Sequence, residues 1–259
     1  MSNDFDYTPT LISPEAQIAD DVQIGYGTRV YSNVIIEKGC KIGDFCSIGH
    51  PFGSGTENPL LIGSDSLIRS HTVLYEGSTL GPKLETGHHV FIREGTTTGI
   101  NLRVGSFSEI SGDCIIGDYC RFQSYVHVGK GSEIGNFVWL FSLNITTNDP
   151  LPPSSIFRGV IIEDGAVVCV GASLLPGAIL RKGAYVSAHA LVSGEVPVGA
   201  VIDHTGEIIC HVSHLLNLET GKRHPWMRHY TDSFPENVQD RINLLYSEVM
   251  QSRDELDIG

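Results

Sequence analysis

The sequence has no long apolar segment and few basic residues. In a chain of 259 residues, no apolar run approaches the roughly 18 residues of a membrane-spanning helix. The first residues, MSNDFDYTPT, contain neither the basic nor the apolar region of a signal peptide, which predicts a cytoplasmic protein. Only 17 residues are basic and 30 are acidic, and the net charge of −13 repels polyanions. We therefore expect neither nucleic acid nor a membrane as a partner.

Cysteine is also scarce, and its spacing matches no common zinc pattern. The six cysteines include two pairs with five-residue gaps, Cys40/Cys46 and Cys114/Cys120. We therefore expect no metal cofactor. Hydrophobic residues make up 41% of the chain and charged residues 18%, which is enough apolar material for a folded core.

An aliphatic residue recurs at every sixth position through most of the chain. The series runs from Ile12 to Ile48, from Ile62 to Thr146, and from Ile162 to Val198. Of its 29 positions 26 are apolar, against 41% for the whole chain, so the period is not a chance effect. The position four residues further on is mostly small, and Cys114 and Cys120 occupy it. That slot favours small buried cysteines over disulfides or metal ligands.

Glycine adds a second period of eighteen residues. It follows the aliphatic residue at steps of eighteen, with one step of twenty, at Gly25, Gly43, Gly63, Gly81, Gly99, Gly117 and Gly135. Three hexapeptides therefore form one coil of a triangular prism, with glycine at one recurring corner. We expect glycine there because a corner needs backbone torsions that other residues rarely adopt. Stacked coils would pair through parallel strands.

This pattern resembles the hexapeptide-repeat acyltransferase superfamily over residues 12 to about 202. The resemblance implies an all-β solenoid, the left-handed parallel β-helix, over residues 1–202. It also implies a homotrimer and an acyl-CoA co-substrate, acetyl-CoA or another. Residues 203–259 are expected to form a cap with an irregular strand pair turning at 219–222 and a helix after Pro235, whose apolar face comprises Val238, Ile242, Leu245 and Val249.

The repeat breaks twice, and such loops commonly carry function. The first break, at 49–61, is predicted to add two residues to the frame, and the second, at 146–161, four. Prolines in the second break cannot donate ladder hydrogen bonds, so this loop must leave the prism.

Three segments resemble the subset of the superfamily that acylates amino groups of nucleotide-linked (dTDP- or UDP-) amino sugars for cell-surface polysaccharides. They are SLIRSHTVLYEGS at 66–78, TGHHVFIREGT at 86–96 and FVWLFSLNITTNDPLPPS at 137–154, and the tail at 224–236 is similar too. The resemblance places Asn148 and Asp149 beside the sugar amine. Acyl transfer to an amine requires removal of a proton, which Asp149 is suited to accept. Asn-Asp-Pro is also an ordinary turn starter.

His127 and Lys130 form a second candidate pair. His127 precedes the aliphatic Val128, so its side chain should point outward, as a substrate contact or as a plain surface histidine. Several relatives carry a catalytic His or Glu where this chain has Lys130. Lysine is a poor base at its ordinary pKa, so Lys130 is expected to contact an anionic substrate group or solvent.

The remaining candidates are contacts to the two substrates. His88 and Glu94 lie in the second matching segment and are candidates to bind the sugar. Glu94 is expected to point outward, where it binds the sugar or only faces solvent. The resemblance implies that the pantetheine arm passes small residues, which Gly171, Ala172 and Ala190 satisfy. Arg181 and Lys182 are candidates for the CoA phosphates.

Other functions remain open. An O-acetyltransferase for a sugar or small alcohol would usually place a histidine near the acceptor, and the long loop has none. A noncatalytic β-helix scaffold would not bind CoA. A zinc carbonic anhydrase of this fold needs a His-x4-His pair, which occurs here only at His224 and His229, outside the repeat. A nucleotidyltransferase would need an additional α/β domain, for which no residues remain.

Overall fold

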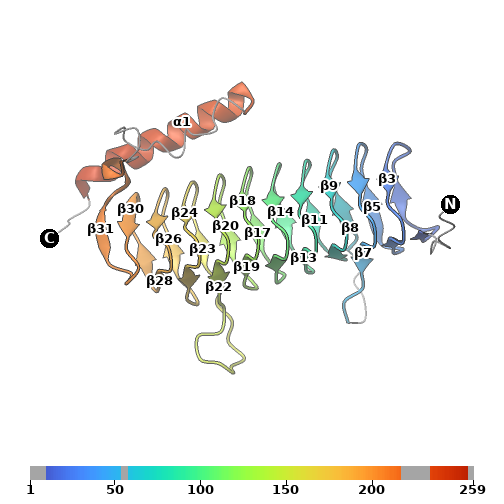
Figure 1. The fold of residues 1–259 in the computed structure, drawn as a ribbon, viewed down its shortest axis with the longest axis horizontal. Coiled ribbons are helices and arrows are strands. Elements are labelled where there is room, and N and C mark those ends of the chain that lie inside the picture. Colours follow the sequence, from blue (N-terminus) through green and yellow to red (C-terminus); the bar gives the residue numbers. More distant parts are fainter. Residues whose placement is uncertain (1–9, 54–57, 217–233, 256–259) are drawn as a thin grey trace, which may run out of the picture. The chain divides into compact units, whose positions relative to one another are not determined.

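The computed structural model describes residues 10–53, 58–216 and 234–255. The chain forms two compact units: residues 1–119 with 123–127, and residues 120–122 with 128–259. Each unit is built from short strands stacked as successive coils of a left-handed parallel β-helix (Figure 1). Within the described ranges, no helix is long and apolar enough to cross a membrane.

Three parallel sheets form the sides of unit 1. Sheet A contains β1 (Leu11–Ile12), β4 (Arg29–Val30), β7 (Ser47–His50), β10 (Val73–Tyr75), β13 (Phe91–Ile92) and β16 (Glu109–Ile110). Sheet B contains β2 (Gln17–Ile18), β5 (Val34–Ile36), β8 (Leu60–Ile62), β11 (Thr79–Leu80), β14 (Thr97–Thr98) and β17 (Ile115–Ile116). Sheet C contains β3 (Gln23–Ile24), β6 (Lys41–Ile42), β9 (Leu67–Ile68), β12 (Glu85–Thr86) and β15 (Arg103–Val104).

Unit 2 repeats this order, with β19 beginning at His127. Its sheet A contains β19 (His127–Val128), β22 (Ile145–Thr146), β25 (Ser173–Leu174) and β28 (Leu191–Val192). Its sheet B contains β20 (Glu133–Ile134), β23 (Ile161–Ile162), β26 (Ile179–Leu180) and β29 (Glu195–Val196). Its sheet C contains β18 (Arg121–Phe122), β21 (Trp139–Leu140), β24 (Val167–Val168), β27 (Tyr185–Val186), β30 (Ala200–Ile202) and β31 (Ile208–His211).

The predicted period explains the core of each unit. Residues eighteen apart pair in register, as Ile92 does with Ile110. Consequently the same position of every coil faces inward, and the aliphatic residues from Val30 onward are buried. The slot four residues later is buried as well, and all six cysteines are free thiols. The predicted all-β solenoid and the buried Cys114 and Cys120 are confirmed.

An antiparallel strand and a helix complete unit 2. Strand β31 pairs antiparallel with β30 and is followed by the 3-10 turn η1 (Val212–His214). Helix α1 (Glu236–Gln251) buries Val238, Ile242, Leu245 and Val249, the predicted apolar face, and leads into η4 (Ser252–Glu255). The predicted turn at 219–222 and most of the tail segment 224–236 lie outside the described residues.

Both predicted insertion lengths are wrong. Strand β7 is followed along the chain by β8 of the next sheet. Ile62 lies fourteen positions after Ile48, where the period needs six, so the insertion is eight residues. Likewise β22 is followed by β23, and Ile162 lies sixteen positions after Thr146, so this insertion is ten residues. A six-residue period cannot distinguish two extra residues from eight, or four from ten, because the frame returns after each hexapeptide. Both loops leave the coil after a sheet A strand.

The explanation for the glycine period is also wrong. Gly25 and Gly43 follow sheet C strands, whereas the later ones follow sheet B strands. Positive φ angles occur instead two residues later, at Phe45 and Asp65 for example. Glycine is required because the next coil is close: a Cβ atom on Gly43 would lie 2.6 Å from the amide nitrogen of Ser70.

The last coil departs from the period. Val198 was predicted in the core register, but β29 buries Val196 instead. Gly194, with a φ of 73°, closes a corner only two residues long between β28 and β29. Because this corner is shorter by two residues than the period requires, the buried position of the last coil falls at Val196 instead of Val198.

Candidate functional site

A chain of hydrogen bonds links three polar side chains at the end of unit 1. The Oγ atom of Ser111 lies 3.1 Å from Nε2 of His127 and donates a hydrogen bond to Oε1 of Glu109 at 3.2 Å. Glu109 and His127 are the outward residues of their strands, and Ser111 begins the turn after β16. All three are half-buried. His127 is therefore an oriented side chain with a carboxylate behind it.

Glu94 is buried rather than exposed to solvent. Its side chain is 12% exposed and forms two 3.1 Å bonds with the guanidinium of Arg93. That guanidinium lies over the rings of Phe52 and Tyr75, at 5.1 and 5.6 Å from their centroids. The prediction that Glu94 points into solvent is wrong, since the register alone does not show that a neighbouring arginine pairs with it.

Glu76 is a buried carboxylate that the sequence analysis missed. It lies eighteen residues before Glu94, directly after β10, and its residue is 6% exposed. Its Oε1 atom accepts a hydrogen bond from the amide of Phe52 at 3.0 Å, which fixes the start of the first loop. The coil period could have identified Glu76, because Tyr75-Glu76 and Arg93-Glu94 occupy the same positions of successive coils. Glu109 and Ser111 were also missed.

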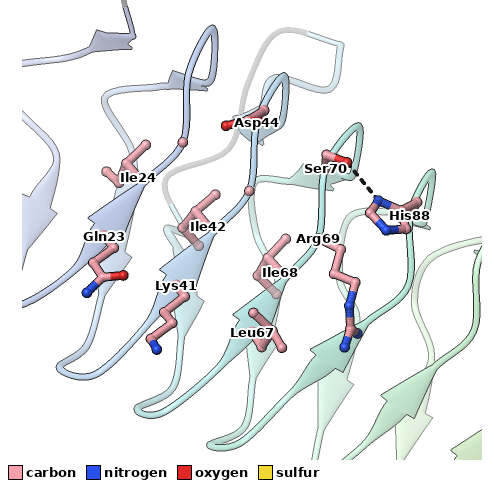
Figure 2. A pocket seen from close by; sticks show the side chains of 12 residues that line it. Gln23, Ile24, Lys41, Ile42, Asp44, Leu67, Ile68, Arg69, Ser70 and His88 are labelled. Carbon is pink, nitrogen blue, oxygen red and sulfur yellow. Dashed lines mark hydrogen bonds between the residues drawn. The ribbon is translucent and has the colours of Figure 1, made fainter.

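His88 lies at a different corner, beside a groove on sheet C of unit 1 (Figure 2). Its Nδ1 atom is 2.7 Å from Oγ of Ser70, and its amide donates to Oγ of Ser106. The groove encloses about 580 Å³, and its floor includes the backbone of Gly25 and Gly43. Its polar side chains are Gln23, Lys41, Asp44, Arg69, Ser70 and His88.

Charges at this groove are partly compensated. Arg69 pairs with Glu85 at 2.8 Å, and Arg103 reaches the same carboxylate at 3.2 Å. Lys41 is exposed at the rim. The groove therefore offers hydrogen-bond donors and positive charge to a small polar or anionic molecule.

In unit 2, Asp149 organises the second loop. Its carboxylate accepts hydrogen bonds from the amides of Leu151 and Ser154 and from the Ser154 hydroxyl, at 2.7 to 3.0 Å. The bond from that hydroxyl holds the pKa of Asp149 below its usual value, followed by the amide bonds. A carboxylate with a lowered pKa is a weaker base, so Asp149 is better suited to orient a group than to remove a proton.

Asn148 and Lys130 meet at the base of this loop. The Nδ2 atom of Asn148 donates to the carbonyl of Lys130 at 3.4 Å, and the carbonyl of Asn148 accepts from the amide of Arg158 at 2.7 Å. This second bond joins the two ends of the loop, at Asn148 and Arg158. The structure thus brings Asn148, Asp149 and the Lys130 backbone together within unit 2.

The five residues predicted to contact CoA have structural partners of their own. Ala172 and Ala190 are buried in the small-residue slot, and Gly171 adopts a φ of 71° at a corner. Arg181 bonds Glu163 and Glu195, each at 2.7 Å, and Lys182 bonds Glu248 of α1 at 2.7 Å. Their assignment to CoA stays a prediction. In the described part of the chain, no three His, Cys, Asp or Glu side chains converge.

Known proteins share this repeat. The family model "Bacterial transferase hexapeptide (six repeats)" matches residues 15–50. The matched residues lie in the first coils of unit 1. It is 32% identical over 130 residues to the bifunctional protein GlmU of Acetivibrio thermocellus, covering 50% of this chain and 27% of that protein. It is 31% identical over 135 residues to the acyl-[acyl-carrier-protein]–UDP-N-acetylglucosamine O-acyltransferase of Thermodesulfovibrio yellowstonii, covering 51% of this chain and 44% of that protein.

A solved structure of similar fold is a UDP-N-acetylglucosamine acyltransferase. It shares 20% sequence identity, covers 71% of this chain and 68% of its own, and gives a TM-score of 0.46. The chain thus spans less than half the length of these two curated relatives.

Proposed function

We propose that the protein is an acyltransferase that moves an acyl group from CoA to the amino group of a nucleotide-linked amino sugar. The observation that carries this proposal is the hydrogen-bonded chain of His127, Ser111 and Glu109, which provides a proton acceptor on a coil of this superfamily. The relatives named above support it, since two are named for acyl transfer to UDP-N-acetylglucosamine.

The reaction fits these side chains. The amine nitrogen attacks the thioester carbonyl, the carbon–sulfur bond breaks, and the thiolate leaves. The amine loses one proton to His127, and the thiolate finally takes that proton as free CoA thiol. Asn148 and Asp149 are proposed to position the amino sugar, because Asp149 fixes the conformation of its loop. Lys130 and His88 are proposed contacts to anionic or polar parts of the acceptor.

Acyl transfer to a hydroxyl is the second candidate. A hydroxyl must lose its proton as it attacks, so it depends on a base more strongly than a neutral amine does. The carboxylate behind His127 favours this reading, as does the printed name of the Thermodesulfovibrio relative. The donor is proposed to be acetyl-CoA or another acyl-CoA, and an acyl carrier protein is the alternative.

We further propose a homotrimer that acts in the cytoplasm, where acyl-CoA and nucleotide sugars are made. Relatives of this fold assemble as trimers, with acceptor sites between subunits. Light scattering in dilute solution should give about three times the subunit mass of 28.1 kDa. A mass equal to one subunit would contradict the trimer.

The function is tested by screening donors against acceptors and following release of free thiol. We expect release only when an acyl-CoA and a nucleotide-linked amino sugar are both present. Turnover with hydroxyl sugars alone would favour the second candidate, and CoA binding without turnover would favour a scaffold.

The role of the second loop is tested by Asp149→Asn. This change removes an acceptor from the Ser154 amide, so kcat/KM should fall by about 100-fold. The matched control is Asp203→Asn, because Asp203 makes the same kind of turn with Thr205 and Glu207. It should retain full activity. Lys130→Ala should raise KM and leave kcat nearly unchanged. Full activity of Asp149→Asn would remove this loop from the proposal.

A further inference from the structure

The groove on sheet C of unit 1 gathers positive charge in a protein that has little of it. Lys41 on β6 and Arg69 after β9 line the groove, and Arg103 on β15 extends the same sheet, whereas the whole chain has a net charge of −13. Among the described residues that line the groove or pair with these cations, the carboxylates are Asp44 and Glu85. Three cations therefore face two carboxylates, which leaves a local excess of positive charge.

Strand register shows how close these cations lie. Lys41 pairs in register with Leu67, and Leu67 pairs with Glu85, the carboxylate that Arg69 contacts. Adjacent strands are about 4.8 Å apart, so Lys41 lies roughly 10 Å from Glu85 along the sheet. The half-buried Leu67 occupies the strand between them, with Arg69 beside it (Figure 2). A small anion over Leu67 can therefore contact the ammonium group of Lys41 and the guanidinium of Arg69.

The guanidinium of Arg69 is held in place and still has donors to offer. One terminal nitrogen donates to the carbonyl of Thr86 at 2.7 Å, and the other to Oε1 of Glu85 at 2.8 Å. A guanidinium has five N–H donors, so the other three have no acceptor among the described residues. Lys41 is exposed, and within the same part of the chain its ammonium group has no acceptor. Because Arg69 is already oriented, a ligand with several acceptor oxygens would bind it at little cost in entropy.

Two backbone amides at the groove add further donors. At the same turn of other coils, the amide donates to a side chain of the next coil, as Tyr26 does to Asp44 and His88 does to Ser106. The amides of Asp44 and Ser70 have no such acceptor in the described ranges, because the side chains of the following coils, Ser70 Oγ and His88 Nδ1, bond each other at 2.7 Å. Both residues line the groove, so these N–H groups border it.

We propose that this groove binds a small phosphate-bearing anion through Lys41, Arg69 and the amide of Ser70. A phosphate monoester carries about −1.5 to −2 charges at pH 7 and three strong acceptor oxygens. It therefore suits an excess of charged donors better than a neutral sugar does. The volume of about 580 Å³ is large enough for a phosphorylated sugar as well as for phosphate itself. The proposal goes beyond the proposed function, which gives no role to Lys41 or Arg69.

Binding is tested with inorganic phosphate by isothermal titration calorimetry on the full chain. We expect saturable binding with a Kd of about 1 mM or tighter. Added sodium chloride should weaken it, because both cationic side chains are partly exposed and their charges are screened. Parallel titrations with a sugar monophosphate and a nucleoside diphosphate show whether the bound phosphate is free or part of a larger molecule, since the true ligand should bind more tightly than inorganic phosphate.

Two variants locate the site. Lys41→Gln should raise the Kd for phosphate by about tenfold, because a charged donor is lost. Its matched control is Lys38→Gln, which removes the same charge from an exposed lysine outside the groove and should leave the Kd nearly unchanged. Leu67→Glu keeps both cations and places a carboxylate between them, so binding should be lost. Ile115→Glu is its control, since Ile115 is an outward residue of sheet B that is 58% exposed, and it should bind phosphate like the parent.

Three results would overturn the proposal. They are phosphate binding that does not saturate, an unchanged Kd in Lys41→Gln, and tighter binding of a neutral hexose than of phosphate. Circular dichroism of each variant shows whether it is folded. If Leu67→Glu fails to fold, the comparison of Lys41→Gln with Lys38→Gln decides the question. None of these measurements requires acyl transfer, so failure of the proposed function would leave this result unaffected.

Discussion

The two units fill the same small-residue slot with different chemistry. Unit 1 uses mainly hydroxyls and thiols, at Thr28, Cys40, Cys46, Ser66, Thr72, Ser78, Thr96 and Ser108. Unit 2 uses mainly alanine, at Ala166, Ala172, Ala178, Ala184 and Ala190. Both sets are buried almost completely, so the slot selects for volume first.

The hydroxyls of unit 1 are tolerated because each finds backbone partners. The Ser108 hydroxyl donates to the carbonyl of Gln123 at 3.1 Å and accepts from the amide of Val126 at 3.1 Å. Thr28 does the same with Gly43 and Cys46. A buried polar group is costly only when it lacks such a partner. In unit 1 the slot side chains thus form hydrogen bonds between coils, whereas the alanines of unit 2 contribute only packing.

The largest effect is expected when a charge enters either core. Ile110 in unit 1 is 1% exposed and Leu174 in unit 2 is fully buried. Changing either to Asp should lower the free energy of unfolding by about 3 kcal/mol or more, because an unpaired charge would be buried. Chemical denaturation measures the loss. Ile115→Asp is the control, since Ile115 is 58% exposed, and it should change stability little. If Ile110→Asp and the parent unfold at the same denaturant concentration, the assignment of Ile110 to the core is contradicted.

A smaller effect is expected at the histidine that joins α1 to the coil of unit 2. His211 is fully buried; Nδ1 accepts from the amide of Ser213 at 3.1 Å, and Nε2 lies 3.0 Å from the carbonyl of Val249. His211→Ala removes the acceptor of the Ser213 amide and one of the partners of the Val249 carbonyl, which keeps its bond from the Ser252 hydroxyl. The change should cost about 1–3 kcal/mol. The exposed His214→Ala is the control. Unchanged helix content on mild heating of His211→Ala would show that other contacts hold α1.

Exchanging the two slot chemistries should have a still smaller effect. Ser108→Ala removes hydrogen bonds to Gln123 and Val126 and should cost about 1 kcal/mol, because an amide and a carbonyl lose a partner. Ala172→Ser adds a hydroxyl of similar size to unit 2. It should be less destabilising if that hydroxyl reaches a carbonyl, as Ser108 does. A Ser108→Ala variant as stable as the parent would show that the hydroxyls only fill space.

The smallest effect concerns reaction rate rather than stability. Burial raises the pKa of the Cys40 and Cys46 thiols in unit 1, and of the Cys169 and Cys210 thiols in unit 2. A raised pKa lowers the thiolate fraction near pH 8, so a disulfide reagent should react slowly with the folded protein. The half-buried Cys169 and Cys210 should react before the other pair. Six thiols should react after unfolding. Rapid reaction of Cys40 in the folded protein would contradict its burial.

The sequence by itself determined the coil. A six-residue period of aliphatic residues suffices because each coil pairs only with its neighbours, so one repeat specifies every inward position. The same period predicted the buried Cys114 and Cys120. The helical spacing of apolar residues after Pro235 predicted the apolar face of α1. It also located both loops, although it gave neither their length nor the sheet from which they leave.

Only the tertiary structure decided what surrounds each polar residue. Glu94 lies in a position that should face solvent, yet it is buried and paired with Arg93. The glycine corner is required by the backbone of the coil above, eighteen or more residues away in sequence. Glu109 lies eighteen residues before His127, so the period places the two on successive coils, but only the structure shows that Ser111 is bonded to both. These contacts depend on which loop folds over which coil, and a local pattern contains no information about distances between residues so far apart in the chain.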